Sequence, residues 1–160
     1  KTVYLSLGAN IGEPYQQLKS ALLNLKEHPE IGELESSSFY RTKPIGPKQP
    51  DFLNLAAKIT TTLSPHALLA ETQAIEAAHH RHRTTHWGPR TLDIDLLMYE
   101  EIQIQSDTLT LPHPEMEQRA FVLIPLAEIA PHLILPSGRA IQSLISHLNP
   151  TDVIKLKEPL

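Results

Sequence analysis

The stretch that decides the fold is Leu92-Asp93-Ile94-Asp95-Leu96-Leu97-Met98-Tyr99. Apolar and acidic residues alternate up to Leu96, which is the period of a β-strand with one buried face. On a strand the two carboxylates share a face with their roots ~7 Å apart, whereas on a helix they would diverge. The opposite, buried face is predicted to carry Leu92, Ile94, Leu96 and Met98. The alternation stops at Leu97, so we expect a central strand that becomes covered on both faces just past the acids.

The segments around this strand predict an α+β fold. Strand and helix patterns follow one another at residues 2–7, 14–28, 34–41, 52–63, 65–78 and 92–99. This order is typical of a ferredoxin-like βαββαβ core, in which a mostly antiparallel sheet carries two helices on one face. Residues 102–104 are expected to return as a partner strand. Short helices after Leu111, with one at 139–148, are predicted to cover the other face. The result is a three-layer αβα arrangement in a single domain of residues 1–160.

Composition narrows the possible partners. The 160 residues carry a net charge of −4, which argues against binding to nucleic acid or to an anionic membrane. No run approaches the ~20 apolar residues that span a bilayer, and the start of the chain lacks the apolar stretch of a secretory signal. The absence of cysteine excludes disulfides and thiolate chemistry, and it fits a reducing compartment. We therefore expect a cytoplasmic protein. A monomer is also expected, although composition does not determine the oligomeric state.

A basic segment precedes the two acids. Residues 79–90 contain four histidines and three arginines, Arg81, Arg83 and Arg90, with no carboxylate. Two carboxylates fill only part of a magnesium shell, so waters and substrate phosphates supply the rest. Arginine forks match phosphate oxygens. Acids and arginines together predict a site for Mg²⁺ and ATP.

Other interpretations of these residues stay open. An isolated Asp-x-Asp pair is more often a solvated or salt-bridged surface feature, and loop arginines can form a nonspecific anion patch. On a continuing helix, His79, His82 and His86 would share a face that suits zinc or nickel, although the Gly88-Pro89 dipeptide indicates that the helix has ended.

Three further features are candidates for ligand contacts. Trp87 lies in a Gly-Pro loop rather than on an apolar stripe, so it is a candidate to close over a flat ring. Residues 43–50 contain three prolines and one glycine, which predicts a loop that is either a plain connector or a preset backbone edge against a ligand. His113 lies between two prolines in a stiff turn, and it is a candidate either for a hydrogen bond to a phosphate or for a purely structural role.

Several ordered motifs resemble those of one family, the 6-hydroxymethyl-7,8-dihydropterin pyrophosphokinases of the folate pathway. The resemblance covers nearly the whole chain. It is carried by Leu7-Gly8-Ala9-Asn10, Ser38-Phe39-Tyr40-Arg41-Thr42, Pro50-Asp51-Phe52-Leu53-Asn54, Arg81-His82-Arg83, residues 87–95, Leu111-Pro112-His113-Pro114 and Arg119-Ala120-Phe121.

The resemblance implies transfer of pyrophosphate from ATP to the hydroxymethyl group of the pterin, which yields AMP and the pterin diphosphate. It implies that Asp93 and Asp95 hold two Mg²⁺ ions and that Arg81 and Arg90 clamp the triphosphate as catalytic residues. The pterin side would be Thr42, Pro44, Ile45, Phe52, Asn54, Trp87 and Phe121. The ATP side would be Gln73, Glu76, Arg81, Arg83, Trp87, Arg90, Leu109, Thr110, His113 and Arg119.

Two other functional classes fit parts of the sequence. Many βαββαβ domains bind RNA, but residues 92–98 lack the stacking aromatics that such a sheet presents. A metal-dependent phosphohydrolase would use the same aspartates, and it would release phosphate or pyrophosphate without an acceptor.

Overall fold

The computed structural model describes residues 1–43, 50–80, 92–148 and 153–156, with the side chain of His80 left out. Its helices are α1 (Pro14–Glu27), α2 (Pro65–His80), α3 (Ala120–Ile129) and α4 (Ile141–Ser146), with a short 3₁₀ helix η1 (Met116–Gln118). Its strands are β1 (Thr2–Ala9), β2 (Ile31–Ser36), β3 (Tyr40–Thr42), β4 (Phe52–Thr61), β5 (Asp93–Tyr99), β6 (Ile104–Gln105), β7 (Thr110–Leu111) and β8 (Val153–Lys155).

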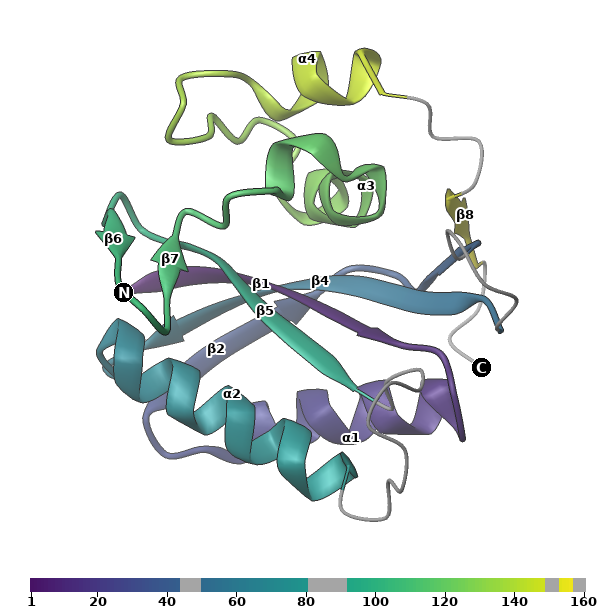
Figure 1. Cartoon of the computed structure of the whole chain (residues 1–160), viewed down its shortest axis with the longest axis vertical. Coiled ribbons are helices and arrows are strands. Elements are labelled where there is room, and N and C mark those ends of the chain that lie inside the picture. The colour runs from purple at the N-terminus through teal and green to yellow at the C-terminus, as the bar shows by residue number, and fades with distance from the viewer. Residues whose placement is uncertain (44–49, 81–91, 149–152, 157–160) are drawn as a thin grey trace.

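The main sheet confirms the predicted α+β fold with a ferredoxin-like core. Its strand order is β5-β1-β4-β3-β8, and β2 also pairs with β4. Every pairing in this sheet is antiparallel. Helices α1 and α2 lie on one face and α3 and α4 on the other, so the three-layer arrangement is visible in Figure 1. Among the described residues, no helix is long and apolar enough to cross a membrane.

Two hydrophobic cores flank the sheet. The first core lies against α1 and α2, and its fully buried residues include Leu5, Leu7, Leu18, Leu55 and Leu68. The second core lies against α3 and α4, and it includes Ala56, Leu97, Val122, Leu126 and Leu144. Because side chains alternate along a strand, the same strands supply both cores. The second core covers only part of its face, and the site described below occupies the rest.

Strand β5 differs from its prediction in two respects. It was expected to be central, but within the described residues it pairs only with β1 and forms an edge of the sheet. Tyr4 lies opposite Met98 while Leu5 lies opposite Leu96, so Leu97 is an extra residue in the strand. This bulge moves Met98 into the second core instead of the face of Leu96.

The prediction that residues 102–104 pair back with this strand is wrong. The amide of Ile102 closes a turn onto the carbonyl of Tyr99 at 3.0 Å. The chain then forms β6, which pairs with β7 in a separate two-stranded sheet. A short alternating pattern therefore predicted a strand, but it could not predict the partner.

The predicted strand at 34–41 is divided into β2 and β3. Ser36 lies opposite Ala57 and Tyr40 lies opposite Asn54, so three residues of this segment span two of β4. The hydroxyl of Ser37 accepts a hydrogen bond from the amide of Ala56 at 2.9 Å, in place of a backbone carbonyl. Because of the extra residue, each side chain of β3 faces the opposite helical layer from the one that it would face in a continuous strand.

Candidate active site

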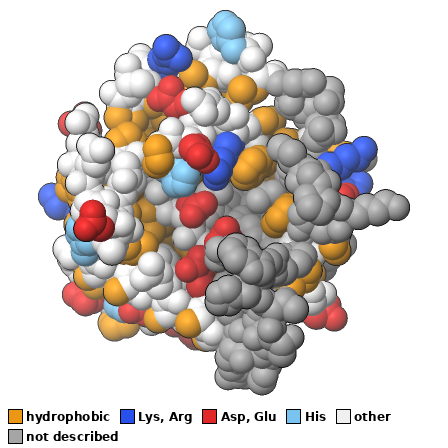
Figure 2. Space-filling model, in the orientation of Figure 1, with side chains coloured by type: hydrophobic (Ala, Val, Ile, Leu, Met, Phe, Trp, Pro, Cys, Tyr) orange, Lys and Arg blue, Asp and Glu red, His pale blue; other side chains and the backbone are white. Residues whose placement is uncertain are grey.

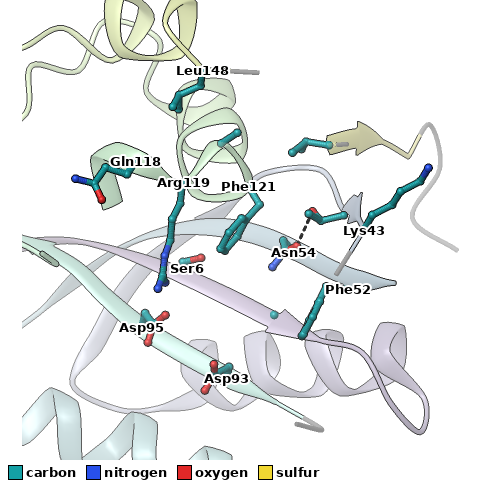
Figure 3. Close-up of a pocket in the computed structure, with 14 residues that line it drawn as sticks. Ser6, Lys43, Phe52, Asn54, Asp93, Asp95, Gln118, Arg119, Phe121 and Leu148 are labelled. Carbon is teal, nitrogen blue, oxygen red and sulfur yellow. Dashed lines mark hydrogen bonds between the residues drawn. The ribbon is translucent and has the colours of Figure 1, made fainter. Parts of the chain in front are cut away.

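A cavity of about 600 Å³ opens on the α3 side of the sheet, where the second core ends. Figure 3 shows side chains from β1, β4 and β5 forming its floor, with the start of α3 above them. Its lining consists of Ser6, Gly8, Thr42, Lys43, Phe52, Asn54, Asp93, Asp95, Gln118, Arg119, Ala120, Phe121, Leu148 and Val153. Acidic side chains gather near the middle of the face in Figure 2, with a basic side chain beside them.

Small residues on β1 keep the floor of the cavity open. Ser6 and Gly8 occupy positions whose neighbours Leu5 and Leu7 point into the first core. A Cβ atom on Gly8 would lie 2.8 Å from Nδ2 of Asn54. Glycine is therefore required at this position if the Asn54 amide is to keep its place.

The Asn54 side chain is fixed by a buried hydrogen bond. The hydroxyl of Thr42 donates to Oδ1 of Asn54 at 2.8 Å. Both side chains are less than 9% exposed, so this bond is screened little by solvent. With its oxygen engaged, the amide directs its nitrogen toward Gly8 and presents a defined polar edge to the cavity.

Two aromatic side chains border the same region of the cavity. Phe52 extends from the start of β4 and Phe121 from the first turn of α3, and in Figure 3 they lie on either side of the space in front of Asn54. Aromatic faces stack well on flat rings. Together with the polar edge of Asn54, they form a slot for a planar ligand that carries hydrogen-bonding groups.

The two aspartates lie at the other end of the cavity. Asp93 and Asp95 share the cavity face of β5, while Ile94 between them is buried in the first core. This arrangement confirms the prediction that the strand aims both carboxylates the same way. Glu76 of α2 accepts a hydrogen bond from the amide of Ile94 at 2.8 Å, which holds the outer edge of β5 between the two acids.

Arg119 places a positive charge over these acids. Its side chain lines the cavity and lies 5.6 Å above the ring of Phe121. It also donates to the carboxylate of Glu115, one helical turn earlier in the chain. In Figure 3 the guanidinium extends from the start of α3 toward Asp95. The cavity thus joins an aromatic slot to a mixed-charge end.

The chemistry of the acidic end fits Mg²⁺. Two carboxylates on one face supply hard oxygen ligands, and Mg²⁺ commonly takes one or two protein carboxylates with waters and phosphates completing its shell. Within the described ranges no three His, Cys, Asp or Glu side chains converge to hold a metal by themselves. A site of this kind binds the ion together with a phosphorylated ligand.

The structure brings together seven of the predicted site residues. Those that line the cavity are Thr42, Phe52, Asn54, Asp93, Asp95, Arg119 and Phe121. Six others lie outside the described residues: Pro44, Ile45, Arg81, Arg83, Trp87 and Arg90. The sequence did not indicate Ser6, Gln118, Leu148 or Val153, because nothing in a lone small, amide or apolar residue distinguishes a cavity wall from a surface.

The remaining predicted residues lie along α2 and beside β5. Gln73 is on the exposed side of α2, and Leu109 is 7% exposed and belongs to the first core. Thr110 is an exposed residue of β7. The backbone amide of His113 donates to the carbonyl of Leu97 at 2.9 Å, which fixes this histidine next to β5. Neither these four residues nor Glu76, the fifth, contribute to the lining of the cavity.

The alternative of three histidines on one helical face concerns a segment that begins in the last turn of α2 as described, Pro65–His80. The ring of His79 is hydrogen-bonded through Nδ1 to the carbonyl of Ile75 at 2.8 Å, so it is engaged with its own helix. His82 and His86 lie outside the described residues.

Comparison with known proteins decides the family. The profile of the 7,8-dihydro-6-hydroxymethylpterin-pyrophosphokinase family matches residues 4–131. The chain belongs to this family. It is accordingly an ATP-dependent pyrophosphokinase, a diphosphotransferase of folate biosynthesis. This result confirms the resemblance drawn from the motifs.

Individual relatives agree with this assignment. The chain is 44% identical over 97% of its length to a 2-amino-4-hydroxy-6-hydroxymethyldihydropteridine pyrophosphokinase of Haemophilus influenzae, 98% of which is covered. It is 43% identical over 96% of its length to the protein of the same name from Methylorubrum extorquens, again with 98% covered.

Solved structures support the fold. The chain superposes with a TM-score of 0.71 and 15% identity on a Plasmodium falciparum HPPK-DHPS, where it covers 91% of its own length and 45% of the other chain. A second HPPK-DHPS, crystallised with substrates, gives a TM-score of 0.69 at 16% identity over 91% of this chain and 43% of that one. The chain thus spans less than half of these longer proteins.

Proposed function

We propose that this enzyme transfers the β,γ-pyrophosphate of ATP to the hydroxymethyl oxygen of 6-hydroxymethyl-7,8-dihydropterin, with Mg²⁺ as cofactor. The observation that carries the proposal is one cavity that joins an aromatic slot, Phe52 and Phe121 around Asn54, to the carboxylates of Asp93 and Asp95. The slot suits a pterin and the acids suit the metal-bound phosphates of ATP. The names of the relatives, which specify this pterin, point the same way.

The pterin would lie between the two phenylalanines. Its amide-like edge offers donors and acceptors to the Asn54 amide, whose oxygen is already held by Thr42. Burying an unpaired polar group costs about 1–3 kcal/mol, so a fixed amide selects rings with a matching edge. Predicted contacts from Pro44, Ile45 and Trp87 would add to this slot.

The ATP would extend along β5. Asp93 and Asp95 would hold two Mg²⁺ ions, which neutralise phosphate charge when bound. Nδ1 of His113 accepts a hydrogen bond from the backbone amide of Glu115 at 3.1 Å. The neutral ring therefore carries its proton on Nε2, which can donate to a phosphate oxygen. Gln73, Glu76, Arg83, Leu109 and Thr110 remain predicted contacts on this side.

In the reaction, the hydroxymethyl oxygen forms a bond to the β-phosphorus of ATP. The bond from the β-phosphorus to the oxygen bridging it to the α-phosphorus breaks, AMP leaves with that oxygen, and the hydroxyl proton is released. The protein contributes orientation and charge stabilisation. Arg119, together with the predicted clamp of Arg81 and Arg90, would stabilise charge on the transferred group.

The direct test is AMP formation from ATP and Mg²⁺ with and without the hydroxymethyl-dihydropterin. We expect AMP only when all three are present. Release of phosphate or pyrophosphate at the same rate without the pterin would instead identify a phosphohydrolase that uses the same aspartates.

A further inference from the structure

A carboxylate outside the cavity connects several parts of its wall. Glu128, in the last turn of α3, accepts hydrogen bonds from the amide of Ser38 at 3.0 Å and from its hydroxyl at 2.9 Å. The phenol of Tyr40 donates to the other carboxylate oxygen at 2.6 Å. Lys155 of β8 lies 4.0 Å from the same carboxylate. One side chain therefore ties α3 to β3, β8 and the segment that precedes β3.

The bulge between β2 and β3 makes this connection possible. Because of the extra residue, Phe39 points into the first core, while Tyr40 faces α3. Without the extra residue, Phe39 would face α3 and Tyr40 would point into the first core, so Tyr40 could not reach Glu128. The bulge also places Thr42, two residues after Tyr40, on the cavity face.

The helix geometry links Glu128 to the aromatic slot. Phe121 and Glu128 are about two turns apart on α3, so they lie on the same side of the helix and are separated by about 10 Å along its axis. Phe121 faces the cavity and Glu128 faces β3. Fixing the end of the helix at Glu128 therefore sets how far Phe121 stands above the sheet.

Strand β8 is held by the same group. Tyr40 lies opposite Lys155 and Thr42 lies opposite Val153 in the pairing of β3 with β8. Val153 lines the cavity and lies two residues before Lys155 on β8. The contact between Lys155 and Glu128 therefore also connects this wall residue to the carboxylate. The Glu128 cluster, defined as Glu128, Ser38, Tyr40 and Lys155, thus connects α3, β3 and β8, which contribute Phe121, Thr42 and Val153 to the cavity.

We propose that Glu128 is a positioning residue for the pterin, acting through Tyr40 and Ser38 to set the width of the slot between Phe121 and the sheet. This inference rests on the proposed function of the cavity. It predicts that Glu128 affects pterin binding more than ATP binding, because β5, which carries the two acids, is separated from β3 by β1 and β4 in the sheet.

The charges in the cluster favour this role. Burial by itself would raise the pKa of Glu128. The hydrogen bonds from Tyr40 and Ser38 and the nearby ammonium of Lys155 outweigh this effect, so the pKa is lowered. Burial, together with the bond and charge of Glu128, raises the pKa of Tyr40. The tyrosine thus stays a donor and the carboxylate stays an acceptor near neutral pH.

The test compares Glu128→Gln and Tyr40→Phe with wild type and with Glu35→Gln, which neutralises an exposed carboxylate on β2. We expect KM for the pterin to rise about tenfold in the first two variants, as for loss of a charge-assisted hydrogen bond, with kcat and KM for ATP changed less than about twofold. Combining both substitutions should add little, since one removes and the other weakens the same charge-assisted hydrogen bond. The control should match wild type.

An unchanged pterin KM in Glu128→Gln, with lower thermal stability alone, would overturn the proposal. Equal losses for the pterin and ATP would also overturn it, because the cluster would then support the whole fold. If Glu128→Gln does not fold, Tyr40→Phe and Ser38→Ala provide the same comparison. Failure of the proposed function would give a different result, because the wild-type enzyme would then form no AMP from ATP when the pterin is added.

Discussion

The two faces of the main sheet are built from the same strands but differ in what covers them. On the α1 and α2 face, Leu5, Leu7, Leu55 and Ile59 are completely or almost completely buried. On the α3 and α4 face the second core stops part-way, and the same strands then carry Ser6, Gly8, Asn54 and the two aspartates. One face supplies most of the packing, which leaves the other free to carry polar groups at a cavity.

The largest expected effect comes from an acid on the open face. Asp95→Asn keeps the shape of the side chain but removes its charge, so we expect turnover to fall by about a hundred- to a thousandfold, as when a charge-stabilising group is lost. The free energy of unfolding should stay within about 1 kcal/mol of wild type. Steady-state kinetics and urea unfolding measure both quantities. Asp107→Asn, in the exposed connection between β6 and β7, is the matched control, and a fully active Asp95→Asn would remove the metal assignment.

A substitution on the closed face should have the opposite profile. Leu7 is fully buried in the first core, so Leu7→Ala should lower the free energy of unfolding by about 2–5 kcal/mol. The turnover of the folded fraction should change little. Leu23→Ala, at a residue that is 53% exposed, should leave stability nearly unchanged. A large loss of turnover per folded molecule in Leu7→Ala would contradict the assignment of stability to one face and activity to the other.

Gly8→Ala tests how tightly the open face is arranged. The added Cβ would lie 2.8 Å from Nδ2 of Asn54, so the amide has to shift. We expect KM for the pterin to rise about tenfold, corresponding to loss of one good hydrogen bond, with a small effect on stability. Thr42→Val, which removes the bond to Asn54, should act in the same direction. Unchanged pterin affinity in both variants would show that Asn54 does not read the ligand.

The smallest expected effect concerns acid stability. The folded pKa of Glu128 is lowered from its ordinary value of 4.5, so its stabilising contribution is present above that pH and is lost as pH falls through the folded pKa. Glu128→Gln should therefore unfold with a shallower dependence on pH below about 5 than wild type. Chemical denaturation at a series of pH values measures the slopes, and parallel curves would contradict the lowered pKa.

The sequence predicted the open face well where the pattern was strong. Alternation around Asp93 and Asp95 was sufficient to place both carboxylates on one side of a strand, because side-chain direction has a fixed period of two. The resemblance motifs identified Phe52 and Asn54 of β4 together with Phe121 of α3, which lies far from them in sequence but meets them in the cavity. Periodicity alone would not have joined them.

The features that were missed depend on contacts between distant segments. The alternation stops at Leu97, but this break was interpreted as burial on both faces of the strand. An extra residue there or before Tyr40 can be recognised as a bulge only against the partner strand. Only short helices were expected after Leu111, because prolines recur there between short apolar runs. Helix α3 nevertheless continues for ten residues with Pro125 inside it. The role of Glu128 could not be predicted because Ser38 and Tyr40 are about ninety residues away.

The central claim is that the open face transfers pyrophosphate to a pterin, and ³¹P analysis of the products tests it most directly. With ATP, Mg²⁺ and 6-hydroxymethyl-7,8-dihydropterin, the account predicts AMP and a pterin diphosphate in equal amounts, formed together. Formation of ADP with a pterin monophosphate, or of free pyrophosphate with the pterin unchanged, would contradict it.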